Sequence, residues 1–281
     1  MQVTTKGIMT ITLLWLAGAA SALAAPIWLE RNFIPEPELV DPVFAIAKDQ
    51  SRVTPDHGAW TSFLQNHLVT GEDGINRLYY GRVLENLTVL ERYIKSLEGT
   101  DVTQLSGADQ LAFWINLYNA ATVRLIAQNY PTDSIRDVNR PWRRPVTMVN
   151  SVALSLGDIE HHIARVQFPD PRIHYAFNCA AIGCPNLAER AYAGDTLEVM
   201  LDEAAWRFVN HPRGVKIEED GDITVSKIYG WYRDDFGGDE ETALDHIREF
   251  AAPELLNALQ GADDIDGYRY DWKLNDANPS D

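Results

Sequence analysis

The sequence is poor in cysteine and in positive charge. Two of its 281 residues are cysteine, too few for a scaffold held together by several disulfides. Its 24 lysines and arginines are outnumbered by 41 aspartates and glutamates, which gives a formal net charge of -17. Because like charges repel, we expect neither nucleic acid nor anionic lipid surfaces as partners.

Other signals of function are also missing from the sequence. It has no glycine-rich loop of the kind that cradles phosphates, no repeat of fixed period and no linker rich in glycine and serine, and no cofactor is expected. The two cysteines are spaced C-x4-C, which matches no strong zinc pattern. His161 and His162 are adjacent on a predicted helix and cannot both face one ion, so no metal site is expected. With 46% hydrophobic residues, the chain is still predicted to fold as a globular protein.

The N-terminus has the pattern of a secretory signal peptide: Lys6, then an apolar run at residues 8–16, then small residues up to Ala24. The run is short for a membrane span, which needs about 20 residues, and no cysteine follows the cleavage site to carry a lipid. We therefore expect residues 1–24 to be removed and the rest to be secreted, into the periplasm of a two-membrane bacterium, with no membrane span. Loss of Lys6 would change the net charge from -17 to -18. The alternative is an N-terminal anchor that is not cleaved.

Removal of 24 of the 281 residues leaves 257, enough for one domain with a sizeable core. The predicted organisation is an extended, proline-rich segment at 25–40, one domain at 41–275 and a tail at 276–281. We predict an α+β fold that is helical in its N-terminal half, with a small mixed or antiparallel sheet in its second half. A subdomain division would fall between Pro131 and Pro145.

Hydrophobic periodicity and turn residues place the elements along this domain. Apolar spacing predicts helices at residues 60–68, 78–97, 106–130, 155–165, 195–209 and 239–251. Alternation predicts strands on either side of Asn150-Ser151, a strand at 172–178, a hairpin around Asp220-Gly221 and an extended segment at 268–275. The stretch at 106–130, capped by Ser106, is apolar on nearly every side, which is typical of a central, buried helix.

Five segments occur in one order along the chain: LAFWINLYNAATVRLI, LSLGDIEHHIAR, RIHYAFNCAAIGCPNL, SKIYGWYRDDFG and YDWKLN. Together they resemble the domain of unknown function 547 family, over about residues 60 to 275. The name of that family records that its chemistry is not established, so the resemblance implies no activity. Function has to be argued from the residues themselves.

The two cysteines, Cys179 and Cys184, are the candidates for thiol chemistry. A free thiol with a pKa of about 8.5 is only slightly ionised at neutral pH and needs a neighbour that stabilises the thiolate. Pro185 suits the first position of a helix, which predicts that Cys184 caps a helix whose free N–H groups face its sulfur. The same N–H groups could form an oxyanion hole. Because Cys179 is predicted to end a strand, Cys184 is the better candidate nucleophile.

A nucleophilic thiol also needs a base, and two histidines are candidates. His174 shares one face of the predicted strand with Asn178, and a turn after the strand would bring Cys184 back toward this face. His161, next to Glu160 on the preceding predicted helix, is the other candidate.

Several polar residues are candidates for holding the base or a substrate. Asn116 and Asn119 lie three residues apart and hence on one face of the central helix. One of them could orient the histidine ring or a substrate carbonyl, as an amide does in cysteine-histidine-asparagine hydrolases; alternatively, both tie the helix to loop backbone. Glu160 is another candidate orienter, or else a carboxylate on a helix surface. Lys227 and Trp231 either belong to an aromatic cleft wall or pack in a core segment.

Two functions fit these residues. The first is a cysteine-dependent hydrolase or acyl transferase that acts on an amide or thioester in the cell envelope, with Cys184 as nucleophile and His174 or His161 as base. The second is a non-catalytic exported domain that binds a small molecule, a peptide or an envelope partner and has a Cys179–Cys184 disulfide, since an exported pair at this spacing can oxidise. The disulfide would remove the nucleophile, so the state of the two sulfurs separates the two functions.

Overall fold

A computed structural model describes residues 26–45 and 53–278. The predicted signal peptide at 1–24 lies outside these residues. The fold is a single α+β domain, as predicted, with helices forming most of the N-terminal half and small sheets of two or three strands. Among the helices described, none is both long enough and apolar enough to cross a bilayer.

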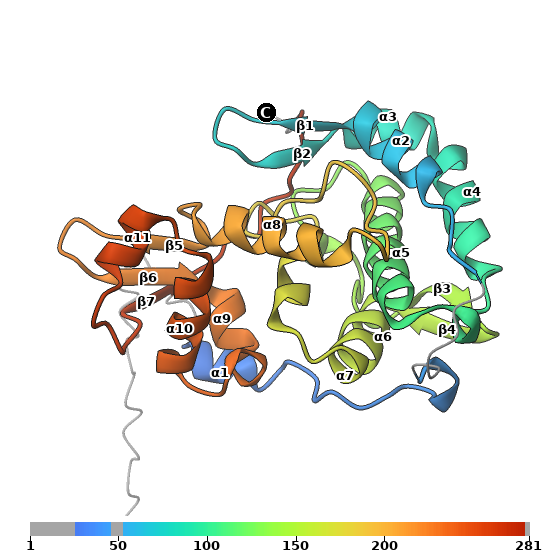
Figure 1. Ribbon diagram of the computed structural model, residues 1–281. Helices are drawn as coiled ribbons and strands as arrows, with labels where there is room; N and C mark the ends of the chain where they lie inside the picture. The colour runs from blue at the N-terminus through green and yellow to red at the C-terminus, as the bar shows by residue number, and fades with distance from the viewer. Residues whose placement is uncertain (1–25, 46–52, 279–281) are drawn as a thin grey trace, which may run out of the picture.

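The 21-residue helix α5 (Gly107–Ala127) forms the centre of the larger half (Figure 1). Ser106 caps it by accepting a hydrogen bond from the backbone N–H of Asp109, as serine commonly does at a helix start. From Asp109 onward every residue of the helix except Arg124 is buried. The prediction of a central helix covered on every side is therefore confirmed.

Three helices pack directly on α5: α3 (Tyr80–Glu85), α4 (Leu87–Glu98) and α6 (Leu156–Ile159). A further helix, α2 (Gly58–His67), packs on α3 and α4, and two 3-10 turns, η2 (Val102–Gln104) and η3 (Ile135–Asp137), flank α5 in sequence. The single helix predicted at 78–97 is wrong, because Asn86, with φ -121° and ψ 27°, separates α3 from α4. Apolar residues of both helices pack in the same core, so the helical spacing of apolar residues continues from α3 into α4. The break at Asn86 therefore leaves no signal in the hydrophobic periodicity.

The sheets are short. β1 (Leu68–Thr70) and β2 (Asn76–Leu78) form one antiparallel hairpin, and β3 (Pro145–Val149) and β4 (Val152–Ser155) form another. In the second half, β5 (Val215–Ile217) pairs antiparallel with β6 (Ile223–Ser226), which pairs parallel with β7 (Gly267–Arg269). Asn150 and Ser151 join β3 to β4 with positive φ values of 46° and 68°, as a tight two-residue turn requires. The predicted hairpins around Asn150-Ser151 and Asp220-Gly221 are confirmed, whereas the β1–β2 hairpin was not predicted.

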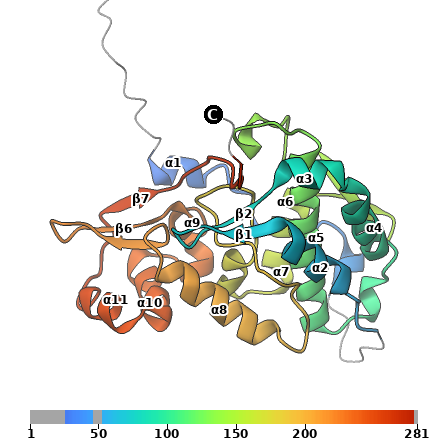
Figure 2. The same ribbon diagram turned by 90° about the horizontal axis from the view of Figure 1, so that it is seen from above.

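The second half is built on the three-stranded sheet. Four elements surround it: α9 (Lys227–Trp231), the 3-10 helix η6 (Arg233–Phe236), α10 (Glu240–Phe250) and α11 (Pro253–Ala258). The helix α8 (Leu197–Val209) runs between the two halves (Figures 1 and 2). Two hydrophobic cores result, one around α5 and one among α8, α10 and the sheet.

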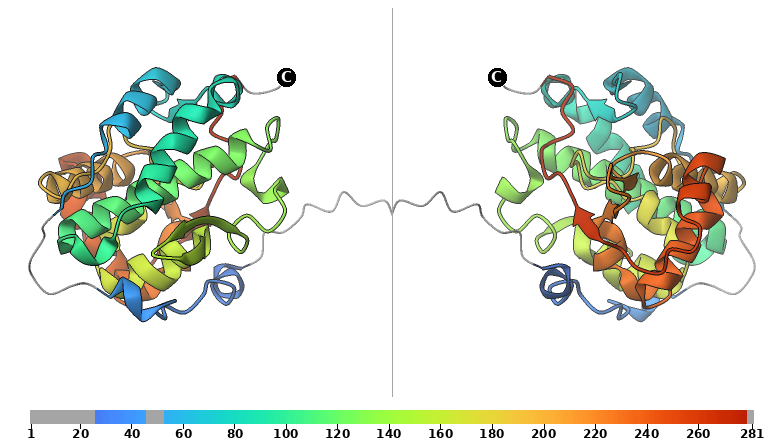
Figure 3. Two further views of the ribbon diagram at one scale, coloured as in Figure 1. Left: turned by 90° about the vertical axis from the view of Figure 1, so that its right-hand side faces the viewer. Right: turned by 90° about the vertical axis from the view of Figure 1, so that its left-hand side faces the viewer.

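Residues 26–45 run along one side of both halves (Figures 1 and 3). The short helix α1 (Ile27–Arg31) packs on α9, and the 3-10 turn η1 (Pro42–Phe44) inserts Phe44 into the main core against Trp114, with ring centroids 5.3 Å apart. Between them, the backbone N–H of Val40 donates to the carbonyl of His162 at 3.0 Å. The N-terminal segment is therefore attached to the domain at both of its ends and in the middle.

The strand predicted at 172–178 is wrong. Residues Pro171–Tyr175 form the 3-10 helix η5, because Pro171 sets the backbone φ of its first position and Asp170 accepts a hydrogen bond from the N–H of Arg172. The segment passes between the two cores: Ile173 is buried in one and Tyr175 in the other. Burial on both sides produced the sequence alternation that resembled a strand with one polar face.

The helix predicted to start at Pro185 is also absent from the structure. Residues 185–196 are irregular, and the next helix, α8, begins at Leu197. The carbonyl of Pro185 accepts a hydrogen bond from the side chain of Asn178 at 2.8 Å, which closes a loop across the two cysteines. Cys184 is therefore not a helix cap, and the oxyanion hole predicted from a helix N-terminus is wrong.

Candidate functional site: a buried thiol pair and a polar network

The two cysteines face each other across a tight loop. Their sulfur atoms lie 2.8 Å apart without being bonded, and the backbone N–H of Cys179 donates to the sulfur of Cys184 at 3.0 Å. Ala180, between them, has a positive φ of 67°, a left-handed conformation that L-residues seldom adopt and that reverses the chain here. Cys184 is buried, with 2% of its surface exposed, whereas Cys179 is partly accessible.

The C-terminal segment completes the environment of the two sulfurs. The hydroxyl of Tyr270 lies 3.0 Å from the sulfur of Cys184 and 3.3 Å from that of Cys179. The loop holds this segment through its backbone, because the N–H of Gly183 donates to the carbonyl of Asp271 at 2.8 Å. A Cβ at position 183 would lie 2.8 Å from the backbone nitrogen of Asp271, so the close approach requires glycine there.

The central helix holds the loop from the other side. The side chain of Asn119 donates to the carbonyl of Ala176 and accepts from the N–H of Asn178, both at 2.9 Å. Asn116 binds Tyr192 in the same way, donating to its carbonyl at 2.8 Å and accepting from its N–H at 3.0 Å. Both amides thus tie α5 to backbone, and neither bonds a histidine ring.

The two thiols differ in pKa. Burial raises the pKa of Cys184, but its contacts with the Cys179 thiol and the Tyr270 hydroxyl outweigh burial and hold the pKa below that of an ordinary cysteine. The contact with Cys184 and burial together raise the pKa of Cys179 well above its usual value. Cys184 is therefore the sulfur that ionises first, as expected from the sequence, although the cause is the partner thiol and the tyrosine rather than a helix.

A polar network surrounds Glu160 on the segment that precedes the thiol loop. The predicted helix capped by Ser155 continues from α6 into the π-helix η4 (Glu160–Ala164) and the short helix α7 (Arg165–Gln167). Single π-helical turns of this kind are frequent at functional sites. Glu160 is only 6% exposed and accepts a hydrogen bond from the hydroxyl of Tyr232 at 2.7 Å, so its prediction as a surface carboxylate is wrong.

Glu160 and His161 shift each other's protonation. Burial raises the pKa of Glu160, but the neighbouring His161 and the Tyr232 hydrogen bond outweigh burial and lower the net pKa. Burial lowers the pKa of His161 to about 4, although Glu160 opposes this shift. At neutral pH the network therefore contains a carboxylate next to an uncharged imidazole.

His174 connects this network to an ion pair. Its Nε2 lies 2.7 Å from the Oδ2 of Asp235, whose two carboxylate oxygens accept hydrogen bonds from Arg165 at 2.5 and 2.9 Å. The imidazole stacks on the ring of Tyr232, with centroids 3.9 Å apart. Burial raises the pKa of Asp235, but the hydrogen bonds from His174 and Arg165 hold it well below its usual range.

The network and the thiol pair are neighbours that do not bond directly. Among the described residues, neither His161 nor His174 makes a hydrogen bond or ring contact with either cysteine. The charge of Glu160 nevertheless contributes to the raised pKa of Cys179, so the carboxylate and this sulfur influence each other electrostatically. The structure thus places the predicted base candidates in the same region as the thiols but not within proton-transfer distance.

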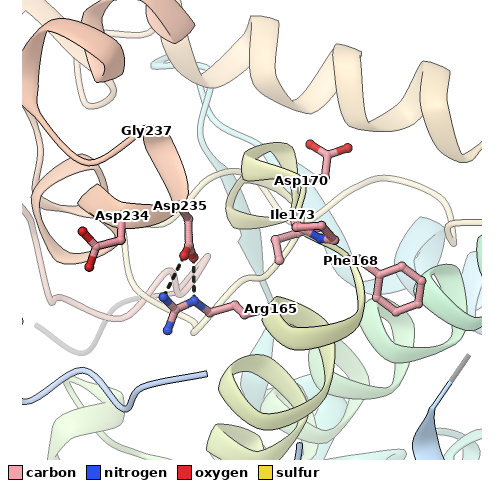
Figure 4. A pocket seen from close by; sticks show the side chains of 8 residues that line it. Arg165, Phe168, Asp170, Ile173, Asp234, Asp235 and Gly237 are labelled. Atoms are coloured by element: carbon pink, nitrogen blue, oxygen red, sulfur yellow. Dashed lines mark hydrogen bonds and ion pairs between the residues drawn. The ribbon is translucent and has the colours of Figure 1, made fainter. Parts of the chain in front are cut away.

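A cavity of about 320 Å³ lies beside the network (Figure 4). Figure 4 shows Arg165 joined to Asp235 on one wall, with Asp170 and Phe168 on another. Each charged side chain that lines this cavity forms an ion pair: Asp235 pairs with Arg165, Asp170 with Arg172 and Asp234 with Arg31. The part of the chain that the structure describes contains no cluster of three or more residues suited to a metal ion.

Lys227 and Trp231 lie on α9, where they bind the N-terminal segment. The amine of Lys227 donates to one carboxylate oxygen of Glu30 at 2.5 Å, and the indole N–H of Trp231 donates to the other at 2.8 Å. The Trp231 ring also packs against Tyr270, with centroids 4.8 Å apart. These two residues therefore connect α1 to the aromatic side of the thiol site.

The sequence did not identify Asp235, Arg165 or Tyr270 as site residues, and it placed Tyr232 only among the clustered aromatics near Trp231. Arg165 had a usable signal, since it lies four residues after His161 on one predicted helix. The other three come from segments more than 50 residues away in the chain, and no local pattern connects them to the thiols.

The fold and the site define a class of protein: a single-domain α+β protein with a thiol pair, one buried and one partly accessible, next to a buried acid–base network. Residues 102–209, which include α5, η4, η5 and both cysteines, match the family model described as Protein of unknown function, DUF547. The resemblance noted in the sequence is thus confirmed for this stretch. Comparison with curated proteins and comparison with solved structures give no match.

Proposed function

We propose that the protein is an exported domain that binds a small molecule, a peptide or an envelope partner, and that Cys179 and Cys184 form a disulfide that fixes the loop between them. The observation that carries the disulfide is the direct contact of the two sulfurs, 2.8 Å apart. A disulfide bond is about 2.05 Å long, so closing it needs a movement of less than about 1 Å. The signal-peptide pattern at 1–24 supports an oxidising compartment, in which such a bond persists.

The surroundings of the loop support the same proposal. Hydrogen bonds hold it on three sides: Asn119 from α5, Asn178 across the base of the loop, and the backbone of Asp271. The loop therefore presents the two sulfurs to each other before any bond forms. A pair fixed in this way loses little conformational entropy on oxidation.

The disulfide can form by thiol–disulfide exchange with an external disulfide, such as that of an oxidoreductase or a small thiol compound. The Cys184 thiolate, the sulfur that ionises first, attacks one external sulfur, and the other external sulfur leaves as a thiolate that takes up a proton. The Cys179 thiol then loses its proton, its sulfur attacks the Cys184 sulfur, the internal disulfide forms, and the second external thiolate leaves and is protonated. The two protein thiols are oxidised, and the external disulfide is reduced to two thiols.

Intact-mass measurement tests the proposal. The full chain, expressed with its own N-terminus in a two-membrane bacterium, is recovered from the periplasm and treated with iodoacetamide before and after reduction. We expect a mass that lacks residues 1–24 and two hydrogens, no alkylation before reduction, and two alkylated sites after it. Two alkylated thiols in the unreduced protein would contradict the disulfide, and an unprocessed chain in the cytoplasm would contradict export. A variant with both cysteines changed to serine is the control for alkylation elsewhere.

A second candidate function, a cysteine-dependent hydrolase or acyl transferase, is favoured by one observation. The Cys184 sulfur has a lowered pKa, and it lies in the same region as two buried histidines whose Nδ1 atoms have no hydrogen-bond partner among the described residues. Perturbed pKa values of this kind cluster at functional sites.

Thioester and ester hydrolysis by the reduced protein tests this candidate. The comparison is between wild type and Cys184→Ala, with Cys179→Ala as the matched variant in the same loop. If Cys184→Ala hydrolyses each substrate as fast as the reduced wild type, this candidate is rejected. Loss of activity only in Cys184→Ala would support it.

A further inference from the structure

A second cavity, of about 280 Å³, lies next to the thiol loop and shares no lining residue with the first. One wall is α8, the opposite wall is the segment 186–192 that follows the cysteines, and β2 closes one edge. Its lining is mixed: apolar side chains such as Leu187, Tyr192 and Phe208 stand beside polar and charged ones, among them Asn186, Glu189, Glu203 and the three arginines Arg190, Arg207 and Arg213. A concave site that combines apolar surface with polar groups able to orient a ligand is a candidate small-molecule site.

Arg213 is the polar group that distinguishes this cavity. Its guanidinium donates to the carbonyl of Ile182 at 3.1 Å and to the side-chain oxygen of Asn186 at 2.6 Å. A guanidinium has five N–H donors, so these two bonds leave three donors without an acceptor, one of them the buried Nε. Asn186 is itself held by the carbonyl of Gly74 and the N–H of Asn76, so the guanidinium is fixed at the wall.

The positive charge of Arg213 has no carboxylate partner among the described residues. Two other arginines line the same cavity, but Arg207 pairs with Glu189 and Arg190 pairs with Glu203. Burial lowers the pKa of Arg213 to about 10, which leaves it charged at neutral pH. In a chain with a net charge of -17, a partly buried arginine that pairs with no carboxylate is the opposite of what solubility alone would produce.

We propose that this cavity binds a small molecule with one carboxylate group and an apolar body, the carboxylate pairing with Arg213 and the body lying between α8 and the segment 186–192. This inference rests on the proposed binding function and names the class of its ligand. The planar guanidinium matches a carboxylate through two parallel hydrogen bonds. Because the other two arginines of the lining are paired with Glu203 and Glu189, the one guanidinium without a carboxylate suits a single carboxylate better than a phosphate, which carries more charge and needs more donors.

The cavity and the thiol loop share Arg213. The residue bonds Ile182 within the loop, and the charge of Cys184 raises its pKa, against the larger effect of burial.

Isothermal titration of the full mature protein tests the site. The probes are acetate, benzoate and phenylpropionate, each compared with its uncharged amide, and inorganic phosphate. We expect at least one aromatic carboxylate to bind and its amide to bind at least about tenfold more weakly, as expected when a charge pair is lost. If no carboxylate in the series binds, or if amide and acid bind equally, the proposal is overturned. Tighter binding of phosphate than of any carboxylate would overturn the ligand class.

A pair of variants connects the binding to Arg213. Arg213→Gln should weaken the binding of the best carboxylate at least about tenfold, whereas Arg207→Gln, which changes a lining arginine that is paired with Glu189, should change the affinity by less than about threefold. Retained affinity in Arg213→Gln overturns the assignment. The comparison of acid with amide uses the wild type alone, so it tests the proposal even if the Arg213→Gln variant does not fold. Mass analysis of the same samples reports the disulfide separately, so failure of this site is distinguishable from failure of the disulfide.

Discussion

Asn116 and Asn119 offer a matched pair of substitutions that tests how the thiol loop is held. Both amides lie on α5, both are buried, and each bonds one backbone N–H and one backbone carbonyl. Asn119 holds the segment that leads into the cysteines, whereas Asn116 holds Tyr192, beyond them. A change to alanine therefore removes the same number of bonds in each case, but only Asn119→Ala releases the thiol loop.

The expected loss of stability is similar for the two variants. Each hydrogen bond contributes about 1 kcal/mol, and a buried backbone group left without a partner costs about 1–3 kcal/mol. Each variant should therefore lower the free energy of unfolding by about 2–5 kcal/mol, which urea unfolding followed by tryptophan fluorescence measures. A loss below about 0.5 kcal/mol in both would refute the hydrogen-bond geometry.

The two variants should differ in the reactivity of the reduced thiols. Opening of the loop exposes Cys184, and every 1.4 kcal/mol lost from the closed state raises the open population about tenfold. Reduced Asn119→Ala should therefore react with iodoacetamide at least about tenfold faster than reduced Asn116→Ala, although both are equally destabilised. Equal rates in the two variants would show that α5 does not hold the loop and would refute the reasoning.

Three further predictions concern stability and the N-terminal segment. In the chain-entropy model, reduction of a disulfide that closes a six-residue loop lowers the free energy of unfolding by about 2 kcal/mol. Differential scanning calorimetry should therefore show a Tm that is about 4–8 °C lower in the presence of reductant. A Tm that the reductant does not change would contradict this prediction. The free energy of unfolding should fall as pH drops from 6.5 toward 4, because three histidines have a pKa of about 4 in the folded protein but about 6.5 in the unfolded chain, which therefore binds more protons in this range. Urea unfolding should give a free energy that is lower at pH 5 than at pH 7 by on the order of 1 kcal/mol for each histidine. Equal urea midpoints at the two pH values would contradict this prediction. These histidines are His57, His161 and His246. Glu30→Gln should weaken the attachment of α1, so limited proteolysis should cleave residues 26–45 faster than in wild type, and an unchanged rate would be inconsistent with the observed ion pair.

The sequence was most informative where one local rule decided the structure. The central helix followed from its apolar residues on all sides and from its Ser106 cap, and the β3–β4 turn followed from Asn150-Ser151. These features depend on residues a few positions apart, so the pattern and the structure coincide.

The sequence misled where two distant cores meet. The alternation at 172–178 resembled a half-exposed strand because the segment is buried between the two cores. Pro185 resembled the start of a helix, because the hydrogen bond that its carbonyl accepts from Asn178 leaves no local pattern in the sequence. A proline after a cysteine predicts a cap only when a periodic apolar stretch follows, and residues 186–196 lack one.

The composition of the site could be predicted only in part. Both cysteines, both histidines and Glu160 were identified from one stretch of 25 residues, from Glu160 to Cys184. Tertiary packing brings their partners Tyr232, Asp235 and Tyr270 into contact with them. These contacts contribute to the pKa shifts in the network and at the thiol pair. Chemistry in this protein therefore depends on contacts between segments that no short motif contains.

A tryptic digest of the protein under non-reducing conditions tests the central claim, the disulfide between Cys179 and Cys184, most directly. Cleavage after Arg172 and Arg190 releases both cysteines in one peptide, residues 173–190. We expect this peptide to be lighter by two hydrogens than the same peptide after reduction, with no alkylation of either cysteine before reduction. A peptide of full mass that carries two alkyl groups in the unreduced sample would contradict the account.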